Sequence, residues 1–426
     1  MVFPDYREGQ LYAEDVPVNK IAEQMQTPVY CYSASALRQN YLSYAAQFKT
    51  ENSLICYAVK ANSNQAIIGT LGKMGAGADV VSEGELRRAL RAGIPAEKIV
   101  YSGVAKTPRE IRFALQQDIL QFNVESQPEL ELLNQIAIAE GKQAPIAFRI
   151  NPDIDARTHE KISTGKASNK FGIPRIRAHQ AYARAAELSG IRVQGIDIHI
   201  GSQLTQLEPF EQAFRCLAEL TAELRGMGHD ISILDIGGGL GIDYADDNQC
   251  PPEITDYATL AKNTLGHLGC RILVEPGRSL VGNIGMLISR VIYIKEGEHD
   301  RFLIIDAGMN DLLRPSMYDA YHEIVPSIKR EGETGLYQVV GPICETGDTF
   351  ARNRAMPPLQ GGDIVAIKNA GAYGAVMASS YNTRPLVPEV LVEGDKVTVI
   401  RPRSTYDDLI GIDTPDGITE AYKADT

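Results

Sequence analysis

Short apolar runs alternate with amphipathic segments between residues 54 and 274. Each run is followed by a turn and then by apolar residues at helical spacing. The eight runs are Leu54–Val59, Ala78–Ser82, Ile99–Ser102, Gln121–Val124, Ile146–Ile150, Gly195–Ile200, Ile233–Ile236 and Arg271–Val274. Eight strand–helix units in one unbroken series predict an α/β fold, a (β/α)8 TIM-type barrel. A doubly wound open sheet is the alternative, but it usually has fewer strands.

The pattern changes after Arg278, where helical spacing nearly disappears. Strands separated by glycine- and proline-rich turns are expected at Met286–Lys295, Arg301–Ala307, Leu336–Val340, Asp363–Lys368 and Val390–Pro402. The pattern therefore predicts a barrel over residues 35–280 and a C-terminal all-β domain, a sandwich or barrel-like fold, over 281–426. Residues 1–34 contain two short strand patterns and are expected to join the β domain, since chain ends often come together.

Composition narrows the classes of function. The net charge of the 426 residues is -12, which argues against a nucleic-acid binder and against binding to anionic membranes. No apolar run has the length of a membrane span, and the N-terminus has no apolar signal core. The six cysteines form no CxxC pair and have no metal-ligand spacing. A cytoplasmic protein with reduced thiols and no metal site is expected.

Lys60 stands at the end of the first apolar run, in the segment Cys56-Tyr57-Ala58-Val59-Lys60-Ala61-Asn62. An ammonium group at the carboxyl end of a buried strand must be solvated, paired or used in chemistry. Lys60 is therefore either an ordinary lysine that reaches the surface or a nucleophilic amine that forms a Schiff base.

Chemistry in a barrel of this kind collects at the carboxyl ends of the strands. In chain order, these ends carry Lys60, Asp79, Arg149, His199, the run Gly237-Gly238-Gly239, and Glu275-Pro276-Gly277-Arg278. The glycine run follows strand seven, where such barrels often bind phosphate, although a glycine-rich turn without a ligand is the alternative. The run fits a dinucleotide-binding fingerprint poorly.

Three of these residues allow two interpretations. His199 is either a packed histidine or a flat ring that lies on a flat cofactor, and Ser202 nearby could reach a phosphate. Glu275 and Arg278 either pair with each other or act separately. In the second case Glu275 would keep a pyridine nitrogen protonated, and Arg278 would bind a carboxylate.

The β domain contains three further segments whose side chains could take part in binding or catalysis. In Leu312–Tyr318, Pro315 marks a helix start, so Arg314 lies at the helix mouth and Tyr318 in its first turn. Cys344 lies beside Glu345 in a polar turn, where a thiol is more reactive than in a core. Tyr373 stands among glycines in Asn369–Gly374.

Six motifs in this order resemble the fold-type III pyridoxal-phosphate decarboxylases. They are YAVKAN at Lys60, HIGSQ at His199, the GGG run, EPGR at Glu275, GPICETGD at Cys344 and GAYG at Tyr373. Each motif alone is weak, but together they cover nearly the whole chain. The segment LLRPSMYDAYHEI, residues 312–324, narrows the resemblance to the diaminopimelate decarboxylases, which catalyse the last step of lysine biosynthesis.

The resemblance implies a cofactor, pyridoxal 5'-phosphate, and a role for each motif. It implies that Lys60 holds the cofactor as a Schiff base, that His199 stacks on the ring and that Glu275 binds the ring nitrogen. The implied phosphate site consists of Ser202, Gly238, Gly239 and the backbone near Gly277, with Arg278 among the cofactor-binding residues and Tyr373 closing over the phosphate.

The implied substrate is meso-2,6-diaminoheptanedioate, which loses a carboxylate at its D centre to give L-lysine. Arg278, Arg314 and Tyr318 would bind the distal carboxylate, Glu345 would pair with the distal ammonium, and Tyr373 would also contact the substrate. Cys344 is the implied proton donor, with Lys60 as its competitor. The family forms its sites across a homodimer interface, so Cys344 and Glu345 are expected to serve the second subunit.

Other functions remain open on the sequence alone. They are a decarboxylase of another basic amino acid or of a carboxylated polyamine, a non-catalytic pyridoxal-phosphate-binding protein, and a racemase. The β-domain residues argue against the non-catalytic protein, which is short. A racemase would need an acid on each face of its carbanion, and the chain offers no obvious tyrosine for that role.

Overall fold

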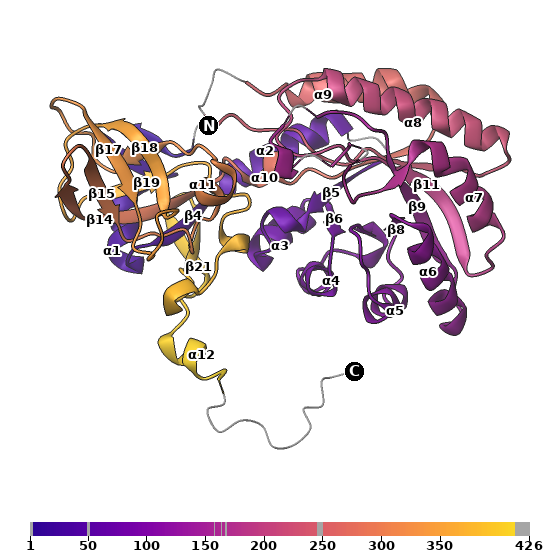
Figure 1. Cartoon of the computed structure of the whole chain (residues 1–426), viewed down its shortest axis with the longest axis horizontal. Coiled ribbons are helices and arrows are strands. Elements are labelled where there is room, and N and C mark those ends of the chain that lie inside the picture. Colours follow the sequence, from indigo (N-terminus) through magenta and orange to yellow (C-terminus); the bar gives the residue numbers. More distant parts are fainter. Residues whose placement is uncertain are drawn as a thin grey trace. The chain divides into compact units, whose positions relative to one another are not determined.

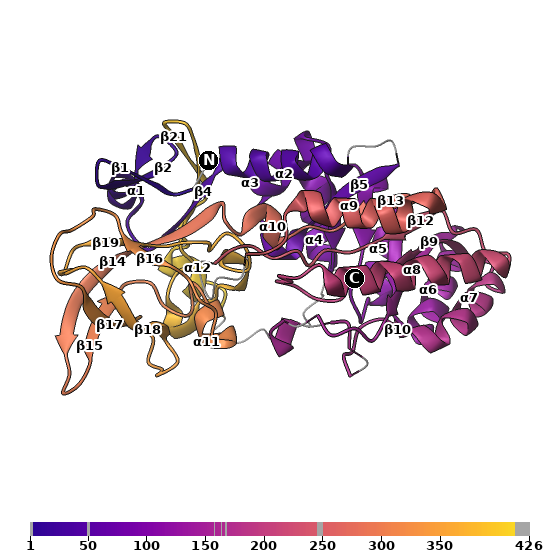
Figure 2. The ribbon, with the colours of Figure 1, turned by 90° about the horizontal axis from the view of Figure 1, so that it is seen from above.

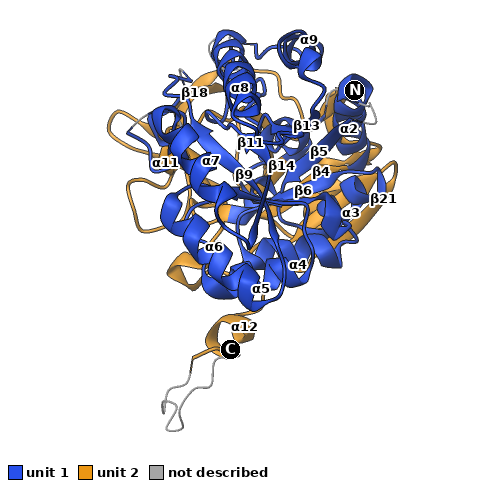
Figure 3. Ribbon diagram, turned by 90° about the vertical axis from the view of Figure 1, so that its right-hand side faces the viewer, with its two compact units in different colours: residues 1–3, 34–285, 369–376 blue, residues 4–33, 286–368, 377–426 orange. Residues whose placement is uncertain are grey.

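The computed structural model describes residues 3–48, 52–156, 158–162, 164–166, 168–244 and 250–413. The chain divides into two compact units (Figure 3). Unit 1 consists mainly of residues 34–285 and 369–376, and unit 2 of residues 4–33, 286–368 and the segment that begins at residue 377. The division differs from the domains expected from the sequence at two places. Residues 281–285 and 369–376, which were expected in the β domain, group with unit 1.

Unit 1 is a closed barrel of eight parallel strands. The strands are β5 (Ser53–Ala58), β6 (Gly77–Val80), β7 (Ile99–Tyr101), β8 (Gln121–Val124), β9 (Ala144–Asn151), β11 (Ile191–Asp197), β12 (Ile233–Asp235) and β13 (Arg271–Val274). Each strand pairs with the next, β8 pairs with β9, and β13 pairs with β5, which closes the barrel. The predicted TIM-type barrel is confirmed.

Helices surround the strands of this barrel (Figures 1 and 3). They are α2 (Ala34–Phe48), α3 (Gln65–Lys73), α4 (Glu83–Arg91), α5 (Pro108–Gln116), α6 (Gln127–Ala139), α7 (Ala178–Ala186), α8 (Glu208–Gly226) and α9 (Ile254–Leu265). Capping residues in the local sequence determine where several of these helices begin. Ser82 and Ser126 cap α4 and α6, and Thr107 forms a capping box with Glu110 at α5. Each cap is worth roughly 1 kcal/mol.

The strands bury both faces, which explains their nearly continuous apolar runs. Leu54 and Cys56 of β5 pack with Val100, Ile233 and Leu273 in one core cluster. Most buried polar side chains of these strands lie at or near a strand end.

The long segment between β9 and α7 packs against the end of β11. It contains a 3-10 turn, η3 (Glu160–Ile162), the short strand β10 (Ile173–Pro174) beside β9, and a second 3-10 turn, η4 (Arg175–Arg177). Ser202 N–H donates to the Ile162 carbonyl at 3.2 Å, and the Thr164 hydroxyl donates to the His199 carbonyl at 3.1 Å. This loop therefore borders the turn that carries His199 and Ser202.

Unit 2 is mostly β-structure, as predicted. Its main sheet has the order β18-β17-β15-β14-β4-β20-β21, and β19 pairs with β14 and β16 (Figure 2). The strands are β4 (Val29–Ser33), β14 (Gly285–Glu296), β15 (Arg301–Ile305), β16 (Ile324–Pro326), β17 (Gly335–Val340), β18 (Thr349–Met356), β19 (Ile364–Ile367), β20 (Glu389–Glu393) and β21 (Lys396–Arg401). The N-terminal strand β4 joins this sheet, as expected.

Three further parts of unit 2 complete its fold. A small antiparallel sheet contains β1 (Asp5–Arg7), β2 (Gln10–Ala13) and β3 (Val16–Pro17), followed by α1 (Val18–Met25). The segment expected as a single strand at 390–402 is a hairpin, because Gly394 turns the chain with a φ of 59°. The helix α12 (Tyr406–Ile410) follows the hairpin. Among the described residues, no helix is both long and apolar enough to span a membrane.

Candidate active site

Lys60 lies just beyond β5, in the one-turn helix η1 (Val59–Ala61). Its ammonium forms an ion pair with Asp79, the fully buried residue near the end of the neighbouring strand β6. About a third of the Lys60 side chain is exposed, so the amine is paired and still accessible. Burial lowers the pKa of Lys60, but the charges of Asp79 and Glu275 outweigh it and raise the pKa above its ordinary value. Lys60 is therefore not an ordinary surface lysine.

Replacing Asp79 with asparagine should make the Lys60 amine more reactive at neutral pH. An adjacent carboxylate typically shifts a pKa by about 1–3 pH units, and its loss leaves more neutral amine at a given pH. We expect the pH at which pyridoxal attaches half-maximally to cofactor-free protein to fall by about that amount. Absorption spectra collected between pH 6 and 10 measure it.

A matched control uses the ion pair between Lys142 and Asp118, which are 2.7 Å apart and in which 79% of the Asp118 side chain is exposed. Asp118→Asn removes a carboxylate from a lysine of the same unit without touching Lys60, and it should leave the attachment profile in place. An unchanged profile in Asp79→Asn would show that Asp79 does not control the amine.

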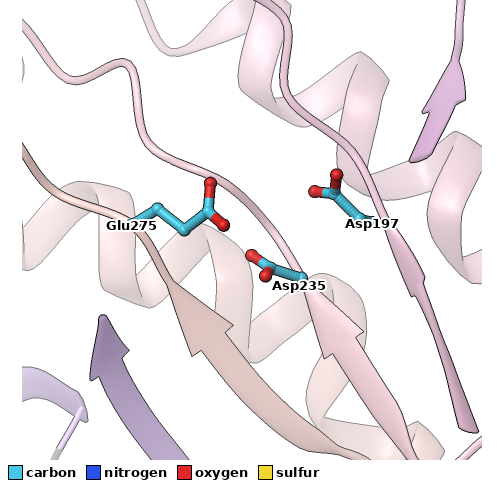
Figure 4. A group of neighbouring side chains, drawn as sticks. All are labelled: Asp197, Asp235 and Glu275. Atoms are coloured by element: carbon cyan, nitrogen blue, oxygen red, sulfur yellow. The ribbon is translucent and has the colours of Figure 1, made fainter. Parts of the chain in front are cut away.

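Three buried carboxyl groups lie together at the ends of neighbouring strands (Figure 4). Asp197 ends β11, Asp235 ends β12, and Glu275 directly follows β13. Each offers an oxygen within 4.8 Å of the others, and in Figure 4 the carboxyl groups of Glu275 and Asp235 face each other. Such a group would suit an amine, a protonated ring nitrogen or a metal ion.

Hydrogen bonds from two sides hold two members of this cluster, Asp235 and Glu275, in place. Asn123 of β8 donates its amide toward Asp235 at 3.4 Å and Glu275 at 3.5 Å. The N–H of Gly237 donates to Asp235 at 3.0 Å. Burial, and then the charge of a neighbouring carboxylate, raises the pKa of Asp197 and Glu275 well above the ordinary value. Because like charges at this separation cannot all ionise, the cluster holds protons at neutral pH.

Asp235 should make the stability of the cofactor-free protein depend on pH. Burial and the charge of Asp197 raise its pKa to about 7, whereas an unfolded aspartate has a pKa of about 3.9. Between these values the unfolded chain has lost the proton that the folded chain retains, so the free energy of unfolding falls as pH rises. Asp235→Asn should flatten this slope and add at most about 4 kcal/mol at pH 8.

Urea unfolding of the cofactor-free protein at pH 5 and pH 8 measures the effect, with Asp230→Asn as a control at an exposed aspartate. The control should keep the wild-type slope. An Asp235→Asn protein that is no more stable than wild type at pH 8 would contradict the assignment of a raised pKa to this carboxyl.

The glycine run lets three strand ends approach closely. A Cβ on Gly238 would lie 2.2 Å from the Glu275 carbonyl oxygen, and one on Gly239, whose φ is 114°, would lie 2.7 Å from the Gly201 carbonyl oxygen. The Gly238 N–H donates to His199 Nδ1 at 3.1 Å. Close packing alone therefore requires glycine here, before any ligand is considered, and it places His199 beside the run.

His199 is held as a neutral imidazole. Its Nδ1 accepts from Gly238, and its pKa is well below the ordinary value because of burial and the positive charges of Arg149 and Lys60. A neutral ring that is only partly covered offers a flat, uncharged face. A planar cofactor ring can stack on such a face.

Arg278 begins the short helix α10 (Arg278–Val281) and is 5% exposed. Its guanidinium donates to the Ser202 hydroxyl at 3.2 and 3.3 Å and to the Tyr244 hydroxyl at 2.6 Å, and it lies 4.9 Å from the Tyr373 ring centroid. Of the two interpretations of Arg278, the one that separates it from Glu275 fits these contacts, because they point toward Ser202 and Tyr373.

Gly277 and Tyr373 both touch the turn that carries Lys60. A Cβ on Gly277 would approach the Cβ atoms of Ala58 and Ala61 to 3.1 Å, and the Tyr373 N–H donates to the Ala61 carbonyl at 2.8 Å. The grouping of residues 369–376 with unit 1 therefore has a local cause, and it places Tyr373 beside the barrel site.

Unit 2 carries the remaining candidate residues. Arg314 begins the short helix α11 (Arg314–Tyr318) and is 6% exposed, and Tyr318 ends it half-buried. Cys344 and Glu345 lie exposed in the turn after β17, where the Glu345 carboxylate accepts a hydrogen bond from Tyr381. Asp348 holds this turn through the N–H groups of Ile343 and Met309, each at 2.7 Å.

Comparison with known proteins gives a family assignment that covers 95% of the chain. Residues 34–282 match the pyridoxal-binding domain of the pyridoxal-dependent decarboxylases. The diaminopimelate decarboxylase of Zymomonas mobilis is 49% identical over 95% of this chain and 96% of its own length. The chain belongs to the diaminopimelate decarboxylase family.

Solved structures of the family support this assignment. Diaminopimelate decarboxylase from Helicobacter pylori, complexed with L-lysine, is 43% identical, covers 92% of this chain and 98% of its own, and has a TM-score of 0.89. Diaminopimelate decarboxylase from M. jannaschii, in complex with L-lysine, is 39% identical, covers 97% and 99%, and has a TM-score of 0.92.

The family's cofactor, pyridoxal phosphate, fits the groups that unit 1 brings together. An aldehyde needs a primary amine, and Lys60 supplies one at the barrel rim. A ring nitrogen needs an acidic partner, and Glu275 is a buried carboxyl with hydrogen-bonded neighbours. A phosphate needs N–H and hydroxyl donors, which the glycine run, Ser202 and Arg278 provide.

The sequence analysis did not give roles to several residues that the diaminopimelate decarboxylase fold places at this site. They are Asp79, Asn123, Asp197, Asp235 and Tyr244. The usable signal was a charged or amide side chain inside or at the end of an apolar run, as in Gly-Ala-Asp-Val for Asp79 and Ile-Leu-Asp for Asp235. Buried polar groups of this kind need partners, and the partner is another strand end.

Proposed function

We propose that this chain removes carbon dioxide from the D centre of meso-2,6-diaminoheptanedioate and yields L-lysine. Identity of 49% with the Zymomonas mobilis enzyme over 95% of the chain carries the proposal. The barrel site supports it, since strand ends of one barrel carry Lys60, an amine for the cofactor's aldehyde, and Glu275, an acidic partner for its ring nitrogen.

In this proposal the candidate site residues of the barrel bind the cofactor. Lys60 holds the cofactor covalently, the His199 ring lies on it, and the Glu275 carboxyl bonds its ring nitrogen. Its phosphate is bound by a set of donors that comprises Ser202, Gly238, Gly239, the backbone at Gly277, Arg278 and Tyr373. When bound, the cofactor supplies an electron sink for the electron pair left at Cα as the carboxylate departs.

Selection of the substrate is assigned to charged residues. Arg278, Arg314 and Tyr318 bind the carboxylate at the L centre, Glu345 pairs with the distal ammonium, and Tyr373 also contacts the substrate. A substrate with a carboxylate and an ammonium at its far end needs both cationic and anionic partners. A substrate without that carboxylate leaves a buried guanidinium without its anion, which produces strong discrimination.

The proton that replaces the carboxylate needs a donor at Cα. We propose Cys344 Sγ for this step, with the Lys60 amine as the competing donor. The exposure of Cys344 and Glu345 supports their use by a second copy of the chain, so the active form would be a homodimer with shared sites. The six cysteines are all free thiols, which supports a cytoplasmic enzyme.

Turnover of two substrates tests the proposal against its nearest rival, a decarboxylase of another basic amino acid. Purified protein loaded with pyridoxal phosphate should have a far larger kcat/KM for meso-2,6-diaminoheptanedioate than for L-lysine. Preference for L-lysine would refute the role given to Arg314 and move the assignment to a lysine decarboxylase.

A further inference from the structure

His322 is a buried histidine that contacts Arg314 in unit 2. It is 1% exposed, its Nε2 lies 2.8 Å from Arg314 Nη1, and its Nδ1 lies 2.8 Å from the Lys368 carbonyl oxygen. A guanidinium has only donors, so Nε2 must accept the bond from Arg314. Nδ1 therefore carries the proton and donates it to the carbonyl. These two contacts fix one tautomer of a neutral imidazole.

The backbone around His322 is anchored by the strands on either side. Ile324 of β16 pairs with Ile367 of β19, and the Lys368 N–H donates to the Glu323 carbonyl at 2.9 Å. Arg354 donates to the His322 carbonyl at 3.1 Å. The backbone of His322 is consequently fixed, so the Nε2 acceptor of its imidazole points in one direction.

We propose that His322 is a positioning residue for the substrate's distal carboxylate, because it holds the Arg314 guanidinium in the plane in which that carboxylate is bound. An imidazole orients an arginine without neutralising its charge, whereas a carboxylate partner would do both. A guanidinium has five N–H donors in a planar fork, so the bond to Nε2 restrains the orientation of the fork. The inference rests on the proposed function, in which Arg314 binds that carboxylate.

Two substitutions separate the acceptor from the rest of the side chain. His322→Asn retains a donor near the Nδ1 position and has no acceptor at Nε2. His322→Gln places an amide oxygen near the Nε2 position, where it can accept from Arg314. Both are small polar changes at the same buried site, so a general loss of packing should affect them equally.

Steady-state kinetics on meso-2,6-diaminoheptanedioate tests the inference. We expect His322→Asn to raise KM about 10-fold or more with kcat within about 3-fold of wild type, because it removes ground-state binding. His322→Gln should recover most of the loss. The Kd of L-lysine, which retains the same carboxylate, should rise in parallel in calorimetric titration. His229→Asn, at a histidine of unit 1, is the control and should leave KM unchanged.

Four results are possible, and each one supports or overturns the inference. A KM that rises in His322→Asn and recovers in His322→Gln supports the inference. Equal loss in both variants, or no change in His322→Asn while Arg314→Leu raises KM, overturns it. If Arg314→Leu itself leaves KM unchanged, the proposed role of Arg314 is wrong and the inference falls with it, while decarboxylation of the same substrate stands as a separate finding.

Discussion

Replacing Lys60 with alanine should abolish the visible absorption band of the cofactor-loaded protein and lower turnover of meso-2,6-diaminoheptanedioate by at least about 10³-fold. The physical reason is that Lys60 offers an accessible amine held at the barrel rim by the buried Asp79. Without that amine the aldehyde has no covalent partner in the site. Absorption spectra and initial rates measure both effects on one preparation.

Lys142→Ala is the matched control, since Lys142 also pairs with an aspartate and is 31% exposed, about as much as Lys60, but lies in the turn between α6 and β9. It should keep the band and the rate. A Lys60→Ala protein that retained the visible band would show that another amine holds the cofactor, and the assignment of the barrel site would be wrong.

Replacing Glu275 with glutamine should lower kcat by about 10²–10³-fold and leave the cofactor attached. A carboxyl beside the ring nitrogen stabilises its protonated form, whereas a neutral amide cannot, so the ring accepts electrons less well. Glu275 is 5% exposed and is held between Asp235 and Asn123, so the exchange removes the group's ability to ionise and changes its shape little.

The exposed Glu253, at the start of α9, provides the control for this exchange. Glu253→Gln should have wild-type kcat and spectrum. A Glu275→Gln enzyme with wild-type kcat would mean that the buried carboxyl does not act on the ring, and that the cluster with Asp235 and Asp197 serves only the fold.

The barrel could be predicted from the sequence because its strands are buried on both faces. Short runs that are rich in apolar residues stand out, and the predicted limits of the runs Gln121–Val124 and Arg271–Val274 equal those of β8 and β13. The strand at Thr349–Met356 was missed for the opposite reason. Its sequence, TFARNRAM, alternates poorly and is polar at its centre, and pairing with β17 rather than local pattern makes it a strand.

The candidate site could be predicted only in part. Motif residues such as Lys60 and His199 could be predicted because they follow apolar runs, at the expected ends of strands. Other contacts depend on which strands are neighbours and on their register, and these cannot be predicted from the local sequence. Examples are the ion pair of Lys60 with Asp79 and the approach of Asp235 to Glu275. The contact of His322 with Arg314 depends likewise on the turn after α11.

One measurement tests the central claim most directly. Purified protein with pyridoxal phosphate is incubated with meso-2,6-diaminoheptanedioate, and carbon dioxide and amino-acid products are quantified. We predict that L-lysine and carbon dioxide form in equal amounts and that the Lys60→Ala protein forms neither. Absence of L-lysine from the wild-type reaction, with the cofactor band present, would contradict the proposed function.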